Sequence, residues 1–158
     1  MTERLQEIAD RLDIRDLVDR YAQCVDSLQY EEVAAVFTED GVLSVCDQPG
    51  VATVTRERHG RADITQAMRW VKRHAMTAHT IGNHTATIDG DTATGETRCI
   101  AHHIGGEPGA LTDLIWNLRY RDTYTRTAEG WRIAHRVLLL DAESEQPWNG
   151  AAARTPAP

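Results

Sequence analysis

The amino-acid sequence predicts an α+β fold in which helices pack on one face of a curved antiparallel sheet. Two stretches indicate the helices, because apolar residues recur three and four positions apart over residues 3–28 and again over 61–76. The sheet is indicated by the second half, where long segments are separated by short turns containing Gly and Asp. These strands come as a run and do not alternate with helices, which favours α+β over a parallel α/β sheet.

Residues 3–28 are expected to form two helical segments, because the apolar spacing slips at Asp13. Asp13 can cap the second segment, and the negative charge of Asp16 stabilises the positive N-terminus of that segment. The other elements expected in this half are a short helix at 31–37, a turn at 39–41, strands at 42–46 and 51–58 around a turn at 48–50, and a helix at 61–76.

The second half is expected to fold as a four-stranded meander. Its strands are expected at 80–88, 92–104, 111–125 and 131–140, with hairpin turns at 89–91, 105–109 and 129–130. In the third strand Trp116 alternates with Leu114 and Leu118, so these side chains share one face. Trp116 is therefore expected to form part of a pocket wall or of the core.

Length and composition favour a single globular domain. The chain has 158 residues, of which 41% are hydrophobic and 26% charged, near the usual size and composition of one domain. We expect that domain to span 1–146. Residues 147–158 end in AAARTPAP and show neither the helical nor the strand spacing of apolar residues. They are expected to form a flexible tail.

Charge and hydropathy exclude two classes of partner. The net charge is −7 and no basic face carries interleaved aromatic residues, so nucleic acid is not an expected partner. No apolar run is long enough for a membrane span, and the N-terminus is amphipathic and acidic, unlike a signal peptide. A cytoplasmic protein without membrane contact is therefore expected.

Metal, disulfide and cofactor chemistry are not expected. His102 and His103 are adjacent in a strand and point to opposite faces, and His79 and His84 have opposite parity. No Gly-rich loop opens a helix, so no phosphate-binding cofactor is predicted. The cysteines are odd in number, widely spaced and expected to be buried thiols: Cys24, Cys46 and Cys99.

Two polar residues stand out in apolar segments, Asp26 near the end of the first helical stretch and His79 near the start of a strand. On a helical wheel Asp26 lies about 140° from Tyr21, at the edge of the apolar stripe. A carboxylate that orients an imidazole would form a proton-transfer pair. The alternatives are an exposed Asp at a helix end and a histidine with a structural role.

Three strings give the chain a resemblance to a known family. They are IRDLVDRYAQCVDSLQYEEVAAVFTEDGVL (14–43), HTIGNHTATIDGD (79–91) and EGWRIAHRVLLLD (129–141). The chain resembles the SnoaL-like branch of the NTF2-like superfamily, and within it the group of scytalone dehydratase, bile acid 7α-dehydratase and hexachlorocyclohexane dehydrochlorinase. The resemblance implies a cone in which a strongly curved mixed or antiparallel sheet wraps around the N-terminal helices and encloses a deep apolar pocket.

The resemblance also implies roles for individual residues. In this group an Asp late in the first helix pairs with a His in the strand after the third helix, which places the pair on Asp26 and His79. The same likeness assigns Tyr21 to catalysis and His103 and Arg136 to the pocket. From the residues themselves, Tyr21 could equally be core, and Arg136 could equally form a structural salt bridge.

Asn83 shares a strand face with His79 by parity and is therefore another candidate for substrate binding, with Trp116 as a wall. The function expected is a cofactor-independent lyase of the dehydratase type, acting on a hydrophobic cyclic or polyketide-like small molecule. An isomerase or cyclase with the same pair and a ligand-binding module without catalysis remain alternatives. The resemblance further implies a homo-oligomer, a trimer or a dimer.

Overall fold

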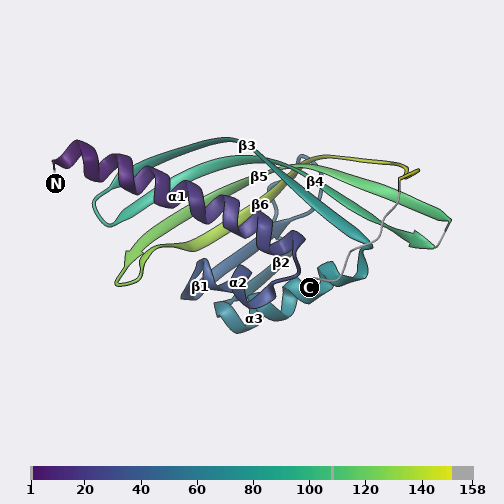
Figure 1. Ribbon diagram of the computed structural model, residues 1–158, viewed down its shortest axis with the longest axis horizontal. Helices are drawn as coiled ribbons and strands as arrows, with labels where there is room; N and C mark the ends of the chain where they lie inside the picture. Colours follow the sequence, from purple (N-terminus) through teal and green to yellow (C-terminus); the bar gives the residue numbers. More distant parts are fainter. Residues whose placement is uncertain (1, 108, 151–158) are drawn as a thin grey trace.

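The computed structural model describes residues 2–107 and 109–150 of the chain (Figure 1). The helices are α1 (Glu3–Asp26), α2 (Tyr30–Ala35), α3 (Gly60–Met68) and the short 3-10 helix η1 (Arg69–Arg73). The strands are β1 (Phe37–Cys46), β2 (Arg56–His59), β3 (Met76–Asp89), β4 (Thr92–Glu107), β5 (Ala110–Thr127) and β6 (Gly130–Pro147).

All six strands form one curved, mixed sheet in the order β2-β1-β6-β5-β4-β3. The pairs β3–β4, β4–β5 and β5–β6 form the predicted antiparallel meander, whereas β1 runs parallel to β6. Helix α1 lies along the long strands and α3 lies near β1 and β2 (Figure 1). The predicted α+β fold with helices on a strongly curved sheet is confirmed.

Helix α1 is continuous, so the predicted break at Asp13 is wrong. Its second half supplies the core, where Ile14, Val18 and Tyr21 are at most 4% exposed. The slip in apolar spacing has a different cause: the residue that the first half of the helix buries is polar, since Asp10 is 3% exposed and bonded to Arg126 and Trp131, whereas Leu5 and Leu12 are exposed. The slip therefore marks a change from apolar to polar burial and leaves the helix intact.

Strands β1 and β2 differ from their predicted bounds. Strand β1 begins at Phe37, and the predicted turn at 39–41 lies inside it as an irregularity in its pairing with β6 between Phe37 and Val42. Strand β2 spans Arg56–His59, so only the last three residues of the segment expected to pair, 51–58, belong to it. The cysteines are buried and unbridged, as predicted.

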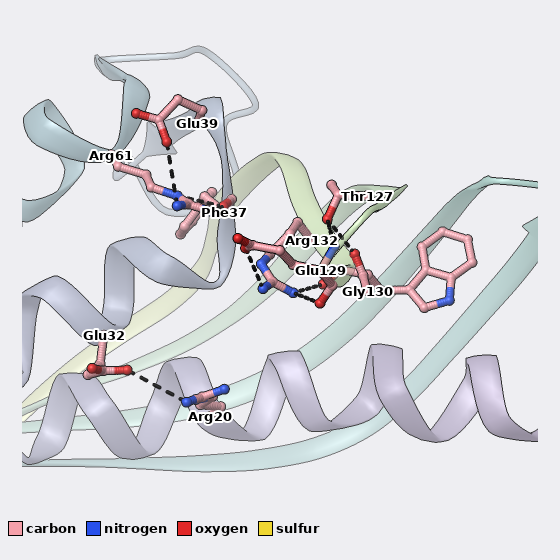
Figure 2. A network of polar contacts seen from close by, with 10 residues as sticks. Arg20, Glu32, Phe37, Glu39, Arg61, Thr127, Glu129, Gly130 and Arg132 are labelled. Carbon is pink, nitrogen blue, oxygen red and sulfur yellow. Dashed lines mark hydrogen bonds and ion pairs between the residues drawn. The ribbon is translucent and has the colours of Figure 1, made fainter.

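Helix α3 is fixed to the start of β1 by Arg61. The Arg61 guanidinium donates two hydrogen bonds to the Phe37 carbonyl oxygen, at 3.0 and 2.8 Å, and forms an ion pair with Glu39 at 3.5 Å (Figure 2). A second arginine, Arg132, closes the β5–β6 turn by donating to the Glu129 and Trp131 carbonyl oxygens (Figure 2). The Arg61 contacts hold the helix that carries one wall of the cavity described below.

Strand β3 contains a bulge. Ile81 pairs with Cys99 and His84 pairs with Thr97, so Gly82 and Asn83 together face a single residue of β4. A bulge reverses the alternation of side chains for all residues that follow it. This irregularity decides which β3 side chains point toward the helices.

The C-terminal end of the described chain is more ordered than predicted. Strand β6 continues to Pro147, and the Trp148 amide donates to the Leu111 carbonyl oxygen at 2.9 Å. The rest of the expected tail, residues 151–158, lies outside the described residues. Within the described ranges, no helix has both the length and the hydropathy needed to cross a membrane.

Candidate active site

A cavity of about 250 Å³ lies between the concave face of the sheet and the helices. Both edge strands of the sheet contribute to it, with His79 on β3 and Arg58 on β2. The remaining lining residues are mostly apolar or aromatic: Tyr21, Val25, Leu43, Val45, Arg56, Ala67, Met68, Trp70, Val71, His103, Trp116, Leu118, Tyr120 and Leu138. A largely apolar cavity with few polar groups is typical of a small-molecule site.

Asp26 and His79 meet at the wall of this cavity. One carboxylate oxygen of Asp26 lies 2.7 Å from His79 Nδ1, and the other accepts the His79 backbone N–H at 2.8 Å. The His79 side chain is 8% exposed and that of Asp26 26% exposed. Two contacts from one carboxylate to one residue fix both the position and the rotation of the imidazole.

The electrostatics of the pair determine which ring nitrogen carries the proton. Burial alone would raise the pKa of Asp26, but the hydrogen bonds and charge of His79 outweigh burial, and the pKa is lowered. Asp26 is therefore ionised near neutral pH and accepts a hydrogen bond from Nδ1–H. In neutral His79 the lone pair then resides on Nε2, which can act as a base.

His103 is a second histidine of the cavity wall, as expected. Its ring centroid lies 5.9 Å from that of His79 and 5.0 Å from that of Trp116, and Nδ1 lies 3.3 Å from the Leu114 carbonyl oxygen. Burial, followed by the charges of His79 and His74, lowers the pKa of His103 to about 4. At neutral pH His103 is uncharged and carries a single N–H. Nδ1–H donates to the Leu114 carbonyl oxygen, which leaves Nε2 as an acceptor.

Tyr21 lines the cavity and is 4% exposed, with its ring 5.7 Å from that of Tyr120. Burial raises the pKa of Tyr21, so its hydroxyl stays protonated and can donate a hydrogen bond. Trp116 also lines the cavity, and its indole N–H donates to Glu143 at 2.8 Å. Trp116 is therefore placed as a wall.

Arg136 does not line the cavity, which corrects its expected role in substrate binding. Its side chain is fully buried and forms two hydrogen bonds to Asp122, at 2.8 and 2.7 Å. The guanidinium carbon lies 4.2 Å from the ring centroids of both Tyr21 and Tyr120. The alternation of β6 does turn Arg136 toward the helices, but these two rings separate it from the cavity.

Asn83 is exposed and also lies outside the cavity, a second correction. The bulge at Gly82 and Asn83 turns His84 inward in its place, and His84 Nδ1 lies 2.8 Å from the Thr97 hydroxyl oxygen. For the same reason His79 and His84 do not have opposite orientations. No group of three His, Cys, Asp or Glu side chains that could hold a metal occurs among residues 2–107 and 109–150.

Among the cavity residues not identified from the sequence, three have side chains that can bind a ligand through a charge or an indole ring: Trp70, Arg56 and Arg58. Trp70 lies in η1, where its ring is 4.9 Å from that of His74, and nothing in the helical spacing distinguishes it from a surface residue. Arg56 and Arg58 alternate with Glu57 on β2, so both point to the same side. That alternation is visible in the predicted strand and could have identified them.

Comparison with known proteins gives the family of the chain. The model of the SnoaL-like domain matches residues 6–137. The chain belongs to the SnoaL-like domain family. A relative of this SnoaL-like protein is the uncharacterised protein Rv2910c of Mycobacterium tuberculosis, 29% identical over 137 residues that cover 83% of this chain and 85% of the relative.

Two solved structures resemble the SnoaL-like protein over most of its length. An NTF2-like protein with a cystatin-like fold from Novosphingobium aromaticivorans is 29% identical, with a TM-score of 0.68 over 87% of this chain and 85% of that one. A hexachlorocyclohexane dehydrochlorinase, LinA type 2, is 16% identical. It has a TM-score of 0.77 over 98% of this chain and 99% of the dehydrochlorinase chain. The predicted membership of the NTF2-like superfamily is confirmed, and the second likeness is one of fold.

Proposed function

We propose that this SnoaL-like protein is a cofactor-independent lyase that removes water from a hydrophobic cyclic or polyketide-like molecule. The observation that carries the proposal is the contact of Asp26 with His79 on the wall of an apolar cavity. The dehydrochlorinase among the similar structures is named for an elimination, which supports the same class of reaction.

In this reaction His79 Nε2 removes a proton from the carbon next to a carbonyl group, and the C–H electrons form an enolate. Ionised Asp26 stabilises the imidazolium that results. The enolate then collapses to a carbon–carbon double bond, and the hydroxyl on the neighbouring carbon leaves with its bonding electrons and the proton from His79. The products are the unsaturated carbonyl compound and water, and His79 is neutral again.

The enolate oxygen needs hydrogen-bond donors in a dry site. Tyr21 and His103 both line the cavity, but only the protonated hydroxyl of Tyr21 is an available donor near neutral pH, because the single N–H of uncharged His103 donates to the Leu114 carbonyl oxygen. We assign the donor role to Tyr21, a substrate contact through the accepting Nε2 to His103, and the wall of the site to Trp116. Arg136 acts on this site only through the tyrosine rings that it contacts.

Two ketones test the proposal. Exchange of the α protons of 1-tetralone in deuterium oxide reports proton removal alone, because this ketone has no leaving group. Conversion of 3-hydroxy-1-tetralone to 1-naphthol reports water loss by mass. We expect the wild type to catalyse both, and Asp26→Asn and His79→Ala to lose about 10²- to 10⁴-fold in rate while remaining folded.

His59→Ala is the matched control, because the His59 side chain is 66% exposed and pairs with Glu57 away from Asp26. Its rates should equal those of the wild type. Proton exchange without water loss would indicate the isomerase or cyclase instead. Binding of the ketones with neither reaction would indicate a ligand-binding module, and near wild-type rates in either dyad variant would refute the role of the pair.

A further inference from the structure

The cavity has a cationic side opposite its histidines. Arg56 and Arg58 lie on β2, and His79 lies on β3, the two edges of the six-stranded sheet. In a flat sheet these edges would be about 24 Å apart, given about 4.8 Å between neighbouring strands. Strong curvature brings both edges to one cavity, so a molecule inside it can contact the base and an arginine at the same time.

Arg56 is already neutralised within the protein. Its guanidinium lies 2.7 Å from a carboxylate oxygen of Asp47. The other oxygen of Asp47 accepts the Thr55 hydroxyl at 2.6 Å. This network holds Arg56 at the cavity rim and leaves it little attraction for a further anion.

Arg58 differs from Arg56 because no carboxylate neutralises it. The Arg58 guanidinium donates a hydrogen bond to the Glu57 carbonyl oxygen at 3.3 Å, while the Glu57 carboxylate contacts His59 at 2.9 Å. In the described part of the chain no carboxylate oxygen lies within 4.0 Å of the Arg58 guanidinium, although this side chain is half-buried against the cavity.

Arg58 differs in this respect from every other arginine of the described chain that has a largely buried side chain. Each of those with a side chain at most 31% exposed contacts a carboxylate within the protein: Arg61 with Glu39, Arg119 with Asp141, Arg126 with Asp10, Arg132 with Glu129 and Arg136 with Asp122. A half-buried guanidinium without such a partner is costly to the free protein and available to a ligand.

We propose that the substrate carries an anionic group, a carboxylate or a group of similar charge, and that Arg58 binds it across the cavity from His79. The inference rests on the proposed function for the reaction but concerns binding alone. The apolar residues between the two edges would contact the ring of the substrate, and Arg58 would fix which carbon faces Nε2. The planar guanidinium fork suits the two oxygens of a carboxylate.

Isothermal titration calorimetry with 2-naphthoate and its neutral analogue 2-naphthamide tests the proposal. We expect the wild type to bind 2-naphthoate at least tenfold more tightly than the amide, with an affinity that falls at high salt. Arg58→Gln should bind both equally, and Arg58→Lys should keep part of the preference. Arg20→Gln is the matched loss of charge at a 63% exposed position on α1 and should change nothing.

Equal affinity of the wild type for the two probes would overturn the proposal. So would a preference that survives in Arg58→Gln, or no measurable binding of 2-naphthoate at millimolar concentration. His79→Ala should retain the preference for the anion although it loses turnover. A charge preference without ketone turnover would therefore refute the lyase alone, and turnover without a charge preference would refute the role of Arg58 alone.

Discussion

At the scale of single residues, Arg136 is the side chain whose surroundings explain its role most fully. It is a cation without solvent exposure, held by Asp122 on one side and by the faces of two tyrosine rings. Coulombic attraction to Asp122 outweighs burial and raises the pKa of Arg136, so the charge is permanent. Both rings line the cavity floor, so Arg136 fixes the shape of the floor without contacting a ligand.

Arg136→Met should lower the free energy of unfolding by about 3–5 kcal/mol, because it leaves the buried Asp122 carboxylate without its counter-charge. Urea denaturation measures this change. The double variant Arg136→Met, Asp122→Leu should recover much of the loss, since both charges are then absent.

Arg20→Met serves as the control for Arg136→Met. The side chains of Arg20 and Glu32 are 63% and 53% exposed, and their charged atoms lie 3.6 Å apart (Figure 2). Exposed pairs contribute at most about 1 kcal/mol. If Arg136→Met lowered the free energy of unfolding by no more than Arg20→Met does, the view that Arg136 and Asp122 form an essential buried pair would be contradicted.

At the scale of elements, α3 and η1 form the side of the cavity that is least tied to the sheet. They contribute Ala67, Met68, Trp70 and Val71 to the lining, yet they belong to no strand ladder. The bonds from Arg61 to the start of β1 are side-chain contacts that fix this segment in place (Figure 2). The position of this wall therefore depends on these polar contacts together with the burial of Ile64 and Val71 in the core.

Arg61→Gln should increase amide hydrogen exchange in α3 and η1 while leaving β4 and β5 protected, because it removes the link to the Phe37 carbonyl oxygen. Hydrogen exchange read by mass spectrometry measures the effect. Arg69→Gln is the control in the same segment, since its pair with Glu31 is 3.9 Å long and exposed. Equal exchange in the two variants would show that Arg61 does not anchor the wall.

Local periodicity was enough to predict the meander and the regions of the helices, including the segments that carry Asp26 and His79. It did not predict that α1 is continuous or that the helix expected at 61–76 ends as α3 and η1 before Met76, where β3 begins. Alternation of side chains, however, is a rule about regular strands, and it gave the wrong face for Asn83 once the β3 bulge intervened. It gave the correct face for Arg136 but could not show that Tyr21, from a distant helix, would cover it. Pairings between distant segments depend on tertiary packing, which spacing along the chain does not encode.

At the scale of the whole molecule, the two faces of the sheet differ in chemistry. The concave face holds the cavity, whereas the opposite face carries charged residues of neighbouring strands, with Arg119 between Asp141 and Glu96. Ile100 lies among them on β4 and is 42% exposed. We predict that the homo-oligomer implied by the family resemblance forms through this face.

We predict that sedimentation at micromolar concentration gives about two or three times the 17.6 kDa of one chain. Ile100→Glu should shift the protein toward the monomer, because it places an unpaired charge on that face. Leu12→Glu, at a 61% exposed position on α1, should leave the oligomer unchanged. A wild-type protein that sediments as a monomer would refute the association.

The bulge of β3 also has a consequence for comparing this chain with its relatives. Between Ile81 and His84 the strand contains one residue more than the facing stretch of β4 requires. A relative with a regular strand there would align with a one-residue gap in the middle of a strand, where gaps are usually avoided. Placing the gap in the next loop instead would shift every residue from His84 to Asp89 out of register and match inward side chains to outward ones.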